Sequence, residues 1–303
     1  MILSPIWLPA ALLAGLFQAW RTALQQRLRR ELTVSGAGLV RYACGAPFAV
    51  AMAAGYFGVR GLALPVFPPA YLALAAGAGL AQILGTALLI LSFGYRGFVA
   101  GTAFSKTEAL MAAVAAAGFF GERLPLLAWI GIGAGVAGIV LLSLPAGEGW
   151  RGLAKGVVQP AALCGLGAAA LFALTGLLVK HATEHLTLAD PIAAALVTLA
   201  IVMLLQTAMH GAWVTWREPA TWAALARNWR NSGLVGLLAA LGSACWFTGF
   251  ATAPVALVRV VGQVEVFFTI GFAHFYLGER IRLREGAGLL LIAAGVAAAL
   301  LAT

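Results

Sequence analysis

The feature that most constrains this chain is a carboxylate that occurs twice, 157 residues apart, inside otherwise apolar segments. Glu108 follows the stretch Phe104-Ser-Lys-Thr, and Glu265 follows Gly262-Gln-Val. In lipid a carboxylate costs free energy at either position, so a residue of this kind marks a functional site by default. The rest of the sequence is interpreted as the scaffold that buries, duplicates and opposes these two segments.

The composition indicates a membrane protein. The 303 residues are 62% hydrophobic and only 10% charged, and apolar runs long enough to span a bilayer recur along the whole chain. The three cysteines lie in apolar segments without CxxC spacing, so neither a disulfide framework nor a metal site is predicted. Before Pro5 there is no basic segment of the kind that opens a signal peptide, and none is predicted.

The apolar runs predict an all-α integral membrane protein with ten transmembrane helices. Proline and glycine residues mark the ends of the runs. The predicted spans are 5–25, 33–58, 68–93, 97–120, 125–144, 157–180, 189–213, 232–252, 255–277 and 283–302. Between the seventh and eighth spans, tryptophans alternate with arginines, which is typical of a short amphipathic segment at the membrane interface.

An internal repeat divides the chain. With an offset of 157 and no gap, residues 84–143 align to residues 241–300, and the identities include Gly131 with Gly288 and Gly138 with Gly295. We therefore predict a first five-helix repeat at 1–147 and a second at 148–303, together forming one transport domain. Because five is odd, the second repeat enters the membrane from the opposite side, as in the inverted repeats of secondary transporters.

Basic residues in the loops predict the orientation. The loops after the odd-numbered spans hold twelve Lys or Arg residues, whereas the alternate loops hold three. Short loops rich in basic residues stay in the cytoplasm, so both termini are expected outside it. The net charge of +9 is accordingly assigned to topology and to anionic lipid head groups, and no nucleic-acid partner is predicted.

The sequence resembles the EamA branch of the drug/metabolite transporter superfamily. The resemblance covers the ten predicted spans and the Gly-Glu-Arg triplets at 121–123 and 278–280, which follow Glu108 and Glu265 by about a dozen residues. Family members commonly carry a Glu-Pro pair at the two glutamates, whereas this chain has Ala109 and Val266 after them. The resemblance implies a carrier for small metabolites, often an exporter, in a bacterial-type cell (inner) membrane.

Helical geometry separates the candidates in the fourth span. In a continuous helix Lys106 and Glu108 lie about 200° apart, so they are not expected to face the same narrow cavity. The repeat places Arg259 and Gln263 on the surface that corresponds to the Lys106 face. This face is the predicted contact for an anionic or carboxylate-bearing substrate.

Two interpretations of the buried charges remain open. In the functional one, Glu108 and Glu265 bind an amine or carry a coupled proton, because desolvation favours the protonated carboxyl. In the structural one, each glutamate is ion-paired or hydrogen-bonded against neighbouring helices. For Arg259 the structural interpretation is favoured, since it lies close enough to a helix start for its side chain to reach the interface.

Other spans carry polar side chains that a helix facing lipid on all sides would lack. Gln18, Arg21 and Gln25 form a stripe in the first span, in which Gln18 is the cavity candidate and Arg21 is either a substrate contact or an interfacial anchor. Gln82 in the third span and Trp246 in the eighth are further candidates, although such residues more often hold helices together.

The sequence thus predicts a secondary transporter that exports a small polar metabolite, such as an amino acid or another carboxylate-bearing compound, by alternating access. The alternative is a proton-coupled exporter of lipophilic cations. The expected partners are a small-molecule substrate and membrane lipids, with coupled protons left open, and the working unit is a monomer or a homodimer. No Walker loop, nucleophile elbow or HExxH motif is present, so neither an enzyme nor a cofactor is predicted.

Overall fold

The computed structural model describes residues 5–29, 31–96, 104–121, 124–143, 160–275 and 285–301, and within these ranges every regular element is a helix. In the first part of the chain the helices are α1 (Trp7–Leu28), α2 (Val34–Ala43), α3 (Ala46–Arg60), α4 (Pro69–Arg96), α6 (Glu108–Phe120) and α7 (Leu126–Ser143). In the second part they are α9 (Pro160–Glu184), α10 (Pro191–Arg217), α11 (Ala220–Arg227), α12 (Trp229–Thr252), α13 (Val255–Gly262), α14 (Glu265–Phe275) and α15 (Glu285–Leu301).

Six helical segments in the described residues are long and apolar enough to cross a membrane, with mean hydropathies from 1.3 to 2.2. Three shorter apolar helices accompany them, within α6, α7 and α15. The prediction of an all-helical, multi-pass membrane protein is therefore confirmed. The arrangement of ten spans in two repeats remains a prediction, although the helices begin and end close to most of the predicted boundaries.

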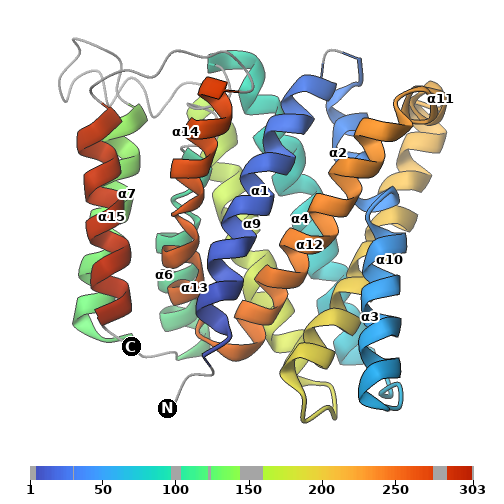
Figure 1. The fold of residues 1–303 in the computed structure, drawn as a ribbon, viewed down its shortest axis with the longest axis horizontal. Helices are drawn as coiled ribbons and strands as arrows, with labels where there is room; N and C mark the ends of the chain where they lie inside the picture. The colour runs from blue at the N-terminus through green and yellow to red at the C-terminus, as the bar shows by residue number, and fades with distance from the viewer. Residues whose placement is uncertain are drawn as a thin grey trace.

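The helices of the two parts of the chain interleave. Helix α1 packs along α12, and α4 packs along α9, so each long helix of one part has a close neighbour in the other. Helices α7 and α15 form a separate pair at one side of the bundle (Figure 1). Helix α1 begins and α15 ends at the same end of the molecule (Figure 1).

Glycines let α7 and α15 approach until their backbones touch. A Cβ atom added at Gly131 would lie 2.6 Å from the carbonyl oxygen of Gly295, and one added at Gly138 would lie 2.5 Å from that of Gly288. In the repeat, Gly131 corresponds to Gly288 and Gly138 corresponds to Gly295. In space the partners are exchanged, so Gly131 lies against Gly295 and Gly138 lies against Gly288. Such close approach replaces side-chain interdigitation in membrane helix pairs.

Gly295→Ala is expected to destabilise the protein by about 1–3 kcal/mol, the usual cost of overpacking. The added Cβ would lie 2.5 Å from the Gly131 carbonyl oxygen, so the backbones must separate. Gly133→Ala is the matched control, because a Cβ there meets nothing within 4 Å. Thermal unfolding of both variants in detergent measures the difference, and equal melting temperatures would contradict the close α7–α15 contact.

The two ends of the bundle differ in charge. The end of α1, the end of α4, the end of α10, helix α11 and the start of α12 lie at the same end of the bundle (Figure 1). Basic residues near these helix ends are among those predicted to share one membrane face: Arg27, Arg29, Arg96, Arg217, Arg227 and Arg230. At the other end are Arg60 and Lys180. The amphipathic segment predicted between the seventh and eighth spans contains α11, and Trp216 and Trp229 beside it are 73% and 66% exposed.

Candidate functional site

Six charged side chains are buried among the described residues. They are Arg21, Arg41, Lys106, Glu108, Arg259 and Glu265, each at most 6% exposed. They come from α1, α2, the turn before α6, the first residue of α6, α13 and α14, and so from three regions of the sequence. Charges with so little exposure inside a membrane protein need partners, and the partners define the site.

Two helix breaks position the glutamates. Helix α13 ends at Gly262 and α14 begins at Glu265, and the amide N–H groups of Gln263 and Val264 donate to carbonyls three residues earlier, as in a tightened 3₁₀ turn. Before α6, the amide of Thr107 likewise donates to the carbonyl of Phe104. Each glutamate is thus the first residue of a helix, where the positive end of the helix dipole stabilises a carboxylate.

The break before α6 corrects the prediction that Lys106 and Glu108 face opposite ways. That prediction assumed a continuous helix through both residues, but α6 begins at Glu108 and residues Lys106 and Thr107 form a turn. Both side chains consequently enter one buried set of ion pairs, Lys106 with Glu265 and Glu108 with Arg259.

Glu265 is the centre of the polar cluster. Its Oε2 accepts a hydrogen bond from Lys106 Nζ at 2.5 Å and another from Gln18 Nε2 at 2.7 Å. The Oε1 atom of Gln18 accepts from the indole N–H of Trp246 at 2.9 Å. Four predicted site residues from four parts of the chain are therefore joined at the middle of α1, where Gln18 lies.

Arg259 is buried beside this cluster, so the prediction that its side chain reaches the interface is wrong. Its Nη1 lies 3.3 Å from Glu108 Oε1, and its Nη2 donates to the carbonyl of Phe172 at 3.0 Å. The guanidinium also lies over the rings of Trp246 and Phe250, at 4.6 Å and 4.8 Å from their centroids. Cation–π attraction, the ion pair with Glu108 and the hydrogen bond to Phe172 hold it in place.

Gln82 and Gln263 lie apart from the Glu265 cluster. The Oε1 atom of Gln82 accepts from Gln206 Nε2 at 2.8 Å, which joins α4 to α10. Gln263 is 1% exposed and neither of its side-chain polar atoms has a hydrogen-bond partner in the described part of the chain. Its amide lies instead against Gly135, where an added Cβ would lie within 2.1 Å of Oε1.

Arg21 is 2% exposed, which rules out the alternative that it is an interfacial anchor. Its Nη2 contacts the hydroxyl of Thr22 at 3.5 Å. Arg41, also 2% exposed, donates to the hydroxyls of Thr86 on α4 and Ser243 on α12, at 3.0 Å and 3.4 Å. These two hydroxyl residues are 157 positions apart, so Arg41 bridges repeat-related positions.

Some predictions concern residues outside the described ranges. They are the two Gly-Glu-Arg triplets beyond Gly121, that is Glu122, Arg123, Glu279 and Arg280. Within the described ranges, no group of three His, Cys, Asp or Glu residues is placed to hold a metal ion.

The sequence alone did not reveal two contributors to the site. The carbonyl of Phe172, which accepts from Arg259, is backbone and carries no sequence signal. Gln206, by contrast, is a lone amide in the apolar run of α10 and is fully buried. Gln206 could have been predicted as Gln82 was, because a polar side chain inside an apolar span is expected to face protein or water and not lipid.

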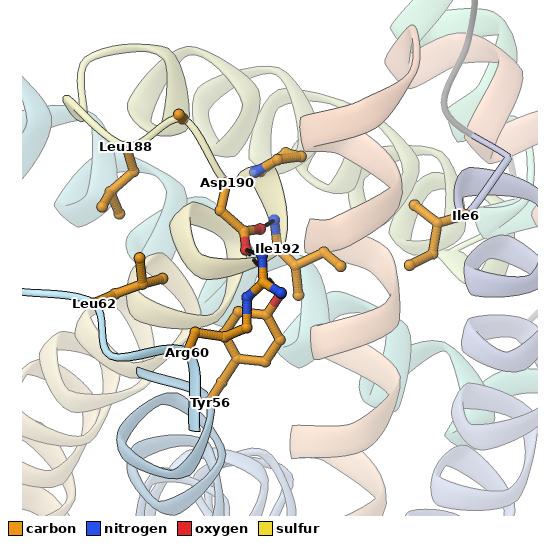
Figure 2. Close-up of a pocket in the computed structure, with 9 residues that line it drawn as sticks. Ile6, Tyr56, Arg60, Leu62, Leu188, Asp190 and Ile192 are labelled. Carbon is orange, nitrogen blue, oxygen red and sulfur yellow. Dashed lines mark hydrogen bonds and ion pairs between the residues drawn. The ribbon is translucent and has the colours of Figure 1, made fainter. Parts of the chain in front are cut away.

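A hollow of about 660 Å³ opens at the end of the bundle where α1 begins, between the end of α3 and the start of α10. Asp190 lies at its centre, where its Oδ2 accepts from the hydroxyl of Tyr56 at 2.8 Å and lies 3.6 Å from Arg60 (Figure 2). Its Oδ1 accepts from the backbone amides of Ile192 and Ala193. Asp190 thus caps α10 and ties it to α3.

Asp190 is expected to make stability fall in acid. Partial burial raises the pKa of its carboxyl, but the Tyr56 hydroxyl, two backbone amides and Arg60 outweigh that effect and lower the pKa below its usual value. A lowered folded-state pKa stabilises the fold above the unfolded pKa of about 3.9, and the contribution disappears as the pH falls through the folded value. Melting temperatures measured between pH 6 and pH 3 should therefore fall less for Asp190→Ala than for the wild type.

The same variant separates the cap from the ion pair. Asp190→Ala should cost about 1 kcal/mol at neutral pH, the typical value for a lost N-cap, and Asp190→Ser should recover most of it because serine also caps. If Asp190→Ser melted like Asp190→Ala, the contacts with Tyr56 and Arg60 would dominate instead.

Apolar helices that bury ion pairs at helix breaks define this chain as a multi-pass membrane protein. Residues 159–301 match the model of the EamA-like transporter family. This part of the chain is therefore similar to that family, and the predicted resemblance to EamA-like transporters of the drug/metabolite transporter superfamily is confirmed. The family consists of membrane transporters and not of enzymes.

A solved structure shares the fold over nearly the whole chain. This structure, titled only as the crystal structure of a protein, superposes with a TM-score of 0.65 over 96% of this chain and 99% of its own, at 17% sequence identity. At this identity the likeness concerns the fold alone. A search among curated proteins found no match.

Proposed function

We propose that this protein is a secondary transporter that exports a small polar metabolite bearing a carboxylate across the cell membrane, by alternating access between two inverted five-helix halves. The termini lie outside the cytoplasm in this proposal, as the distribution of basic residues favours. The single observation that carries the proposal is the buried pair of Lys106 and Glu265, joined at 2.5 Å at mid-depth.

Each buried ion pair crosses from one proposed half to the other. Lys106 belongs to the first half and Glu265 to the second, whereas Glu108 belongs to the first and Arg259 to the second. Movement of the halves against each other must therefore break or exchange these pairs. A substrate carboxylate can replace Glu265 at Lys106, and a substrate ammonium can replace Lys106 at Glu265, so binding lowers the cost of the exchange.

The arrangement of the helix breaks supports a transport role. Discontinuous helices near the membrane midplane are the usual substrate and ion sites of secondary transporters, because their free backbone groups and helix ends face the pathway. In this chain the breaks before Glu108 and Glu265 occur at repeat-related positions. We therefore propose that the pair of helix breaks, and not either glutamate alone, forms the transport site.

One observation favours proton-coupled export of lipophilic cations as a second candidate. Glu108 Oε2 is buried and has no hydrogen-bond partner in the described residues, although Oε1 is paired with Arg259. A buried carboxylate oxygen of this kind can take up a proton. In this mechanism Glu108 would carry the coupled proton and Glu265 would exchange Lys106 for the cationic substrate.

Counterflow in proteoliposomes tests both candidates. A panel of carboxylate-bearing metabolites should include one that exchanges, and Glu265→Gln should slow that exchange at least tenfold. Glu184→Gln is the matched control, because Glu184 lies at the exposed end of α9 and pairs with His181 of the same helix. Wild-type exchange in Glu265→Gln would overturn the proposal. Uptake of a lipophilic cation driven by a pH gradient, with no metabolite exchange, would favour the second candidate.

A further inference from the structure

The buried charges of the bundle do not balance. Four cationic side chains are buried among the described residues, but only two carboxylates are buried with them. Lys106 and Arg259 account for both carboxylates through the pairs with Glu265 and Glu108. Arg21 and Arg41 are left without an ion-pair partner in the described part of the chain.

Arg21 is poorly satisfied by its surroundings. Its guanidinium makes a long hydrogen bond, 3.5 Å to the hydroxyl of Thr22. That hydroxyl already donates to the carbonyl of Gln18 at 2.6 Å, which fixes its direction. The Nε atom of Arg21 is buried and has no hydrogen-bond partner among the residues that the structure describes.

Among the described residues, the groups that hold Arg41 are neutral. It donates to the hydroxyls of Thr86 and Ser243, and its guanidinium lies 5.7 Å from the ring centroid of Tyr42. Its Nε atom is also buried, and it has no hydrogen-bond partner within the described ranges. Hydroxyl oxygens accept a hydrogen bond from a cation but do not neutralise its charge.

The two guanidinium groups also act on each other. The charge of Arg41 repels Arg21, and the charge of Arg259 repels Arg41, whereas Glu265 is the one buried carboxylate that attracts Arg21. Arginine does not lose its proton in proteins, so this excess of positive charge persists at any physiological pH. A buried uncompensated charge is costly, and a bound anion removes the cost.

The packing of the helices does not require these charges. The positions 157 residues later, on α9 and α10, hold the neutral residues Leu178 and Thr198. Arg21 and Arg41 thus have no charged counterpart at that offset in the second half of the sequence. This asymmetry indicates a ligand and not a scaffold role.

We propose that Arg21 and Arg41 form an oxyanion site for the substrate, and that the substrate is a small organic anion with two negative charges, held through a carboxylate or a phosphate group. Guanidinium groups match the planar oxygens of both groups with paired hydrogen bonds. The site deepens the proposed transport function and rests on it. Gln18, one helical turn before Arg21 on α1, connects the oxyanion site to the Lys106–Glu265 pair.

The test is the thermal stability of the purified full-length protein in detergent. Succinate and inorganic phosphate are added separately at the ionic strength of a sodium chloride reference, so that screening is constant. At least one of them should raise the melting temperature by several degrees, because a ligand that binds the folded state stabilises it. The probe that acts distinguishes a carboxylate substrate from a phosphate one.

Three variants locate the effect. Arg21→Gln and Arg41→Gln should abolish the rise, whereas Arg217→Gln, which changes a cation at the exposed end of α10, should keep it. Without added anion, Arg21→Gln should melt above the wild type because a repulsive charge is gone. If Arg41→Gln does not fold, Arg41→Lys keeps the charge and should weaken the rise through loss of the paired hydrogen bonds.

Two results would overturn the proposal. One is the absence of any rise with either anion in the wild type, and the other is a rise that persists in the Arg21→Gln/Arg41→Gln variant. Neither result touches the transport function itself, because counterflow of a neutral zwitterion that depends on Glu265 would still establish a carrier. Loss of all counterflow with a retained anion effect would instead contradict transport and leave the oxyanion site standing.

Discussion

Lys106→Met is expected to lower the free energy of unfolding by about 3–5 kcal/mol and to abolish transport, because it leaves Glu265 buried without its counter-ion. Glu265 is 1% exposed, so water cannot compensate the lost ammonium. Gln18 retains its hydrogen bond to the carboxylate but carries no charge. Thermal unfolding in detergent and counterflow in proteoliposomes measure the two effects on the same preparation.

The double variant Lys106→Met/Glu265→Gln separates stability from function. Replacing both charges removes the unpaired ion, and replacement of buried pairs by neutral groups is often close to neutral for stability. Stability should therefore return towards the wild-type value while transport stays absent. If Lys106→Met alone melted like the wild type, the pair would contribute nothing to the ground state and the exchange mechanism would lose its basis.

The all-helical membrane fold could be predicted because the bilayer leaves few choices. A segment in lipid must satisfy its backbone internally, so a long apolar run predicts a helix with little ambiguity. The second predicted span, 33–58, corresponds to α2 and α3 at 34–60, and the third, 68–93, corresponds to α4 at 69–96. Polar and proline residues between the runs marked the connections.

The helix breaks could not be predicted from this sequence. The residues after the two glutamates are Ala109 and Val266, and neither is a helix breaker in the way that proline would be. Without a break, the helical wheel placed Lys106 and Glu108 on opposite faces. The local helix propensity of these residues gives no sign of a break, because tertiary packing and buried charge determine the backbone conformation there.

Ion-pair partners were also beyond the sequence. The apolar runs showed that four cations lie within spans, but Lys106 and Glu265 are 159 residues apart and no spacing rule joins them. Arg259 was misplaced for a related reason, since its position near a helix start favours the interface unless a buried carboxylate holds it. Four of the predicted site residues, Gln18, Lys106, Trp246 and Glu265, form one connected cluster, and their role in binding stays a prediction.

Connection through Trp246 makes the two ion pairs one system. The indole N–H of Trp246 binds Gln18, which in turn binds Glu265, while the face of the same indole lies against Arg259. A change in the hydrogen bonds of Glu265 can therefore shift Arg259 through the rigid indole ring of Trp246. The shape of the Arg259 side chain, and not only its charge, should therefore matter for transport.

Arg259→Lys is accordingly expected to lower the free energy of unfolding by about 2–4 kcal/mol and to slow transport at least tenfold, although the charge is kept. The guanidinium spans two acceptors, Glu108 and the Phe172 carbonyl, and stacks on Trp246 and Phe250. A single ammonium group on a flexible stem cannot reproduce the ion pair, the hydrogen bond and the stack together. Losing one charge-assisted hydrogen bond and a buried cation–π contact accounts for the magnitude.

Two companion variants identify which interaction matters. Phe250→Leu keeps an apolar side chain in place but removes one ring face, so it should cost less than Arg259→Lys and leave the pair with Glu108 intact. Glu108→Gln removes the carboxylate charge that pairs with the guanidinium. The differences in stability and transport rate between arginine and lysine at position 259 should therefore become smaller in this variant. Thermal unfolding and counterflow of the wild type, Arg259→Lys, Glu108→Gln and the double variant Glu108→Gln/Arg259→Lys give the coupling. Equal behaviour of Arg259→Lys and the wild type would mean that only the charge at this position is used, and the link through the indole would then have no part in transport.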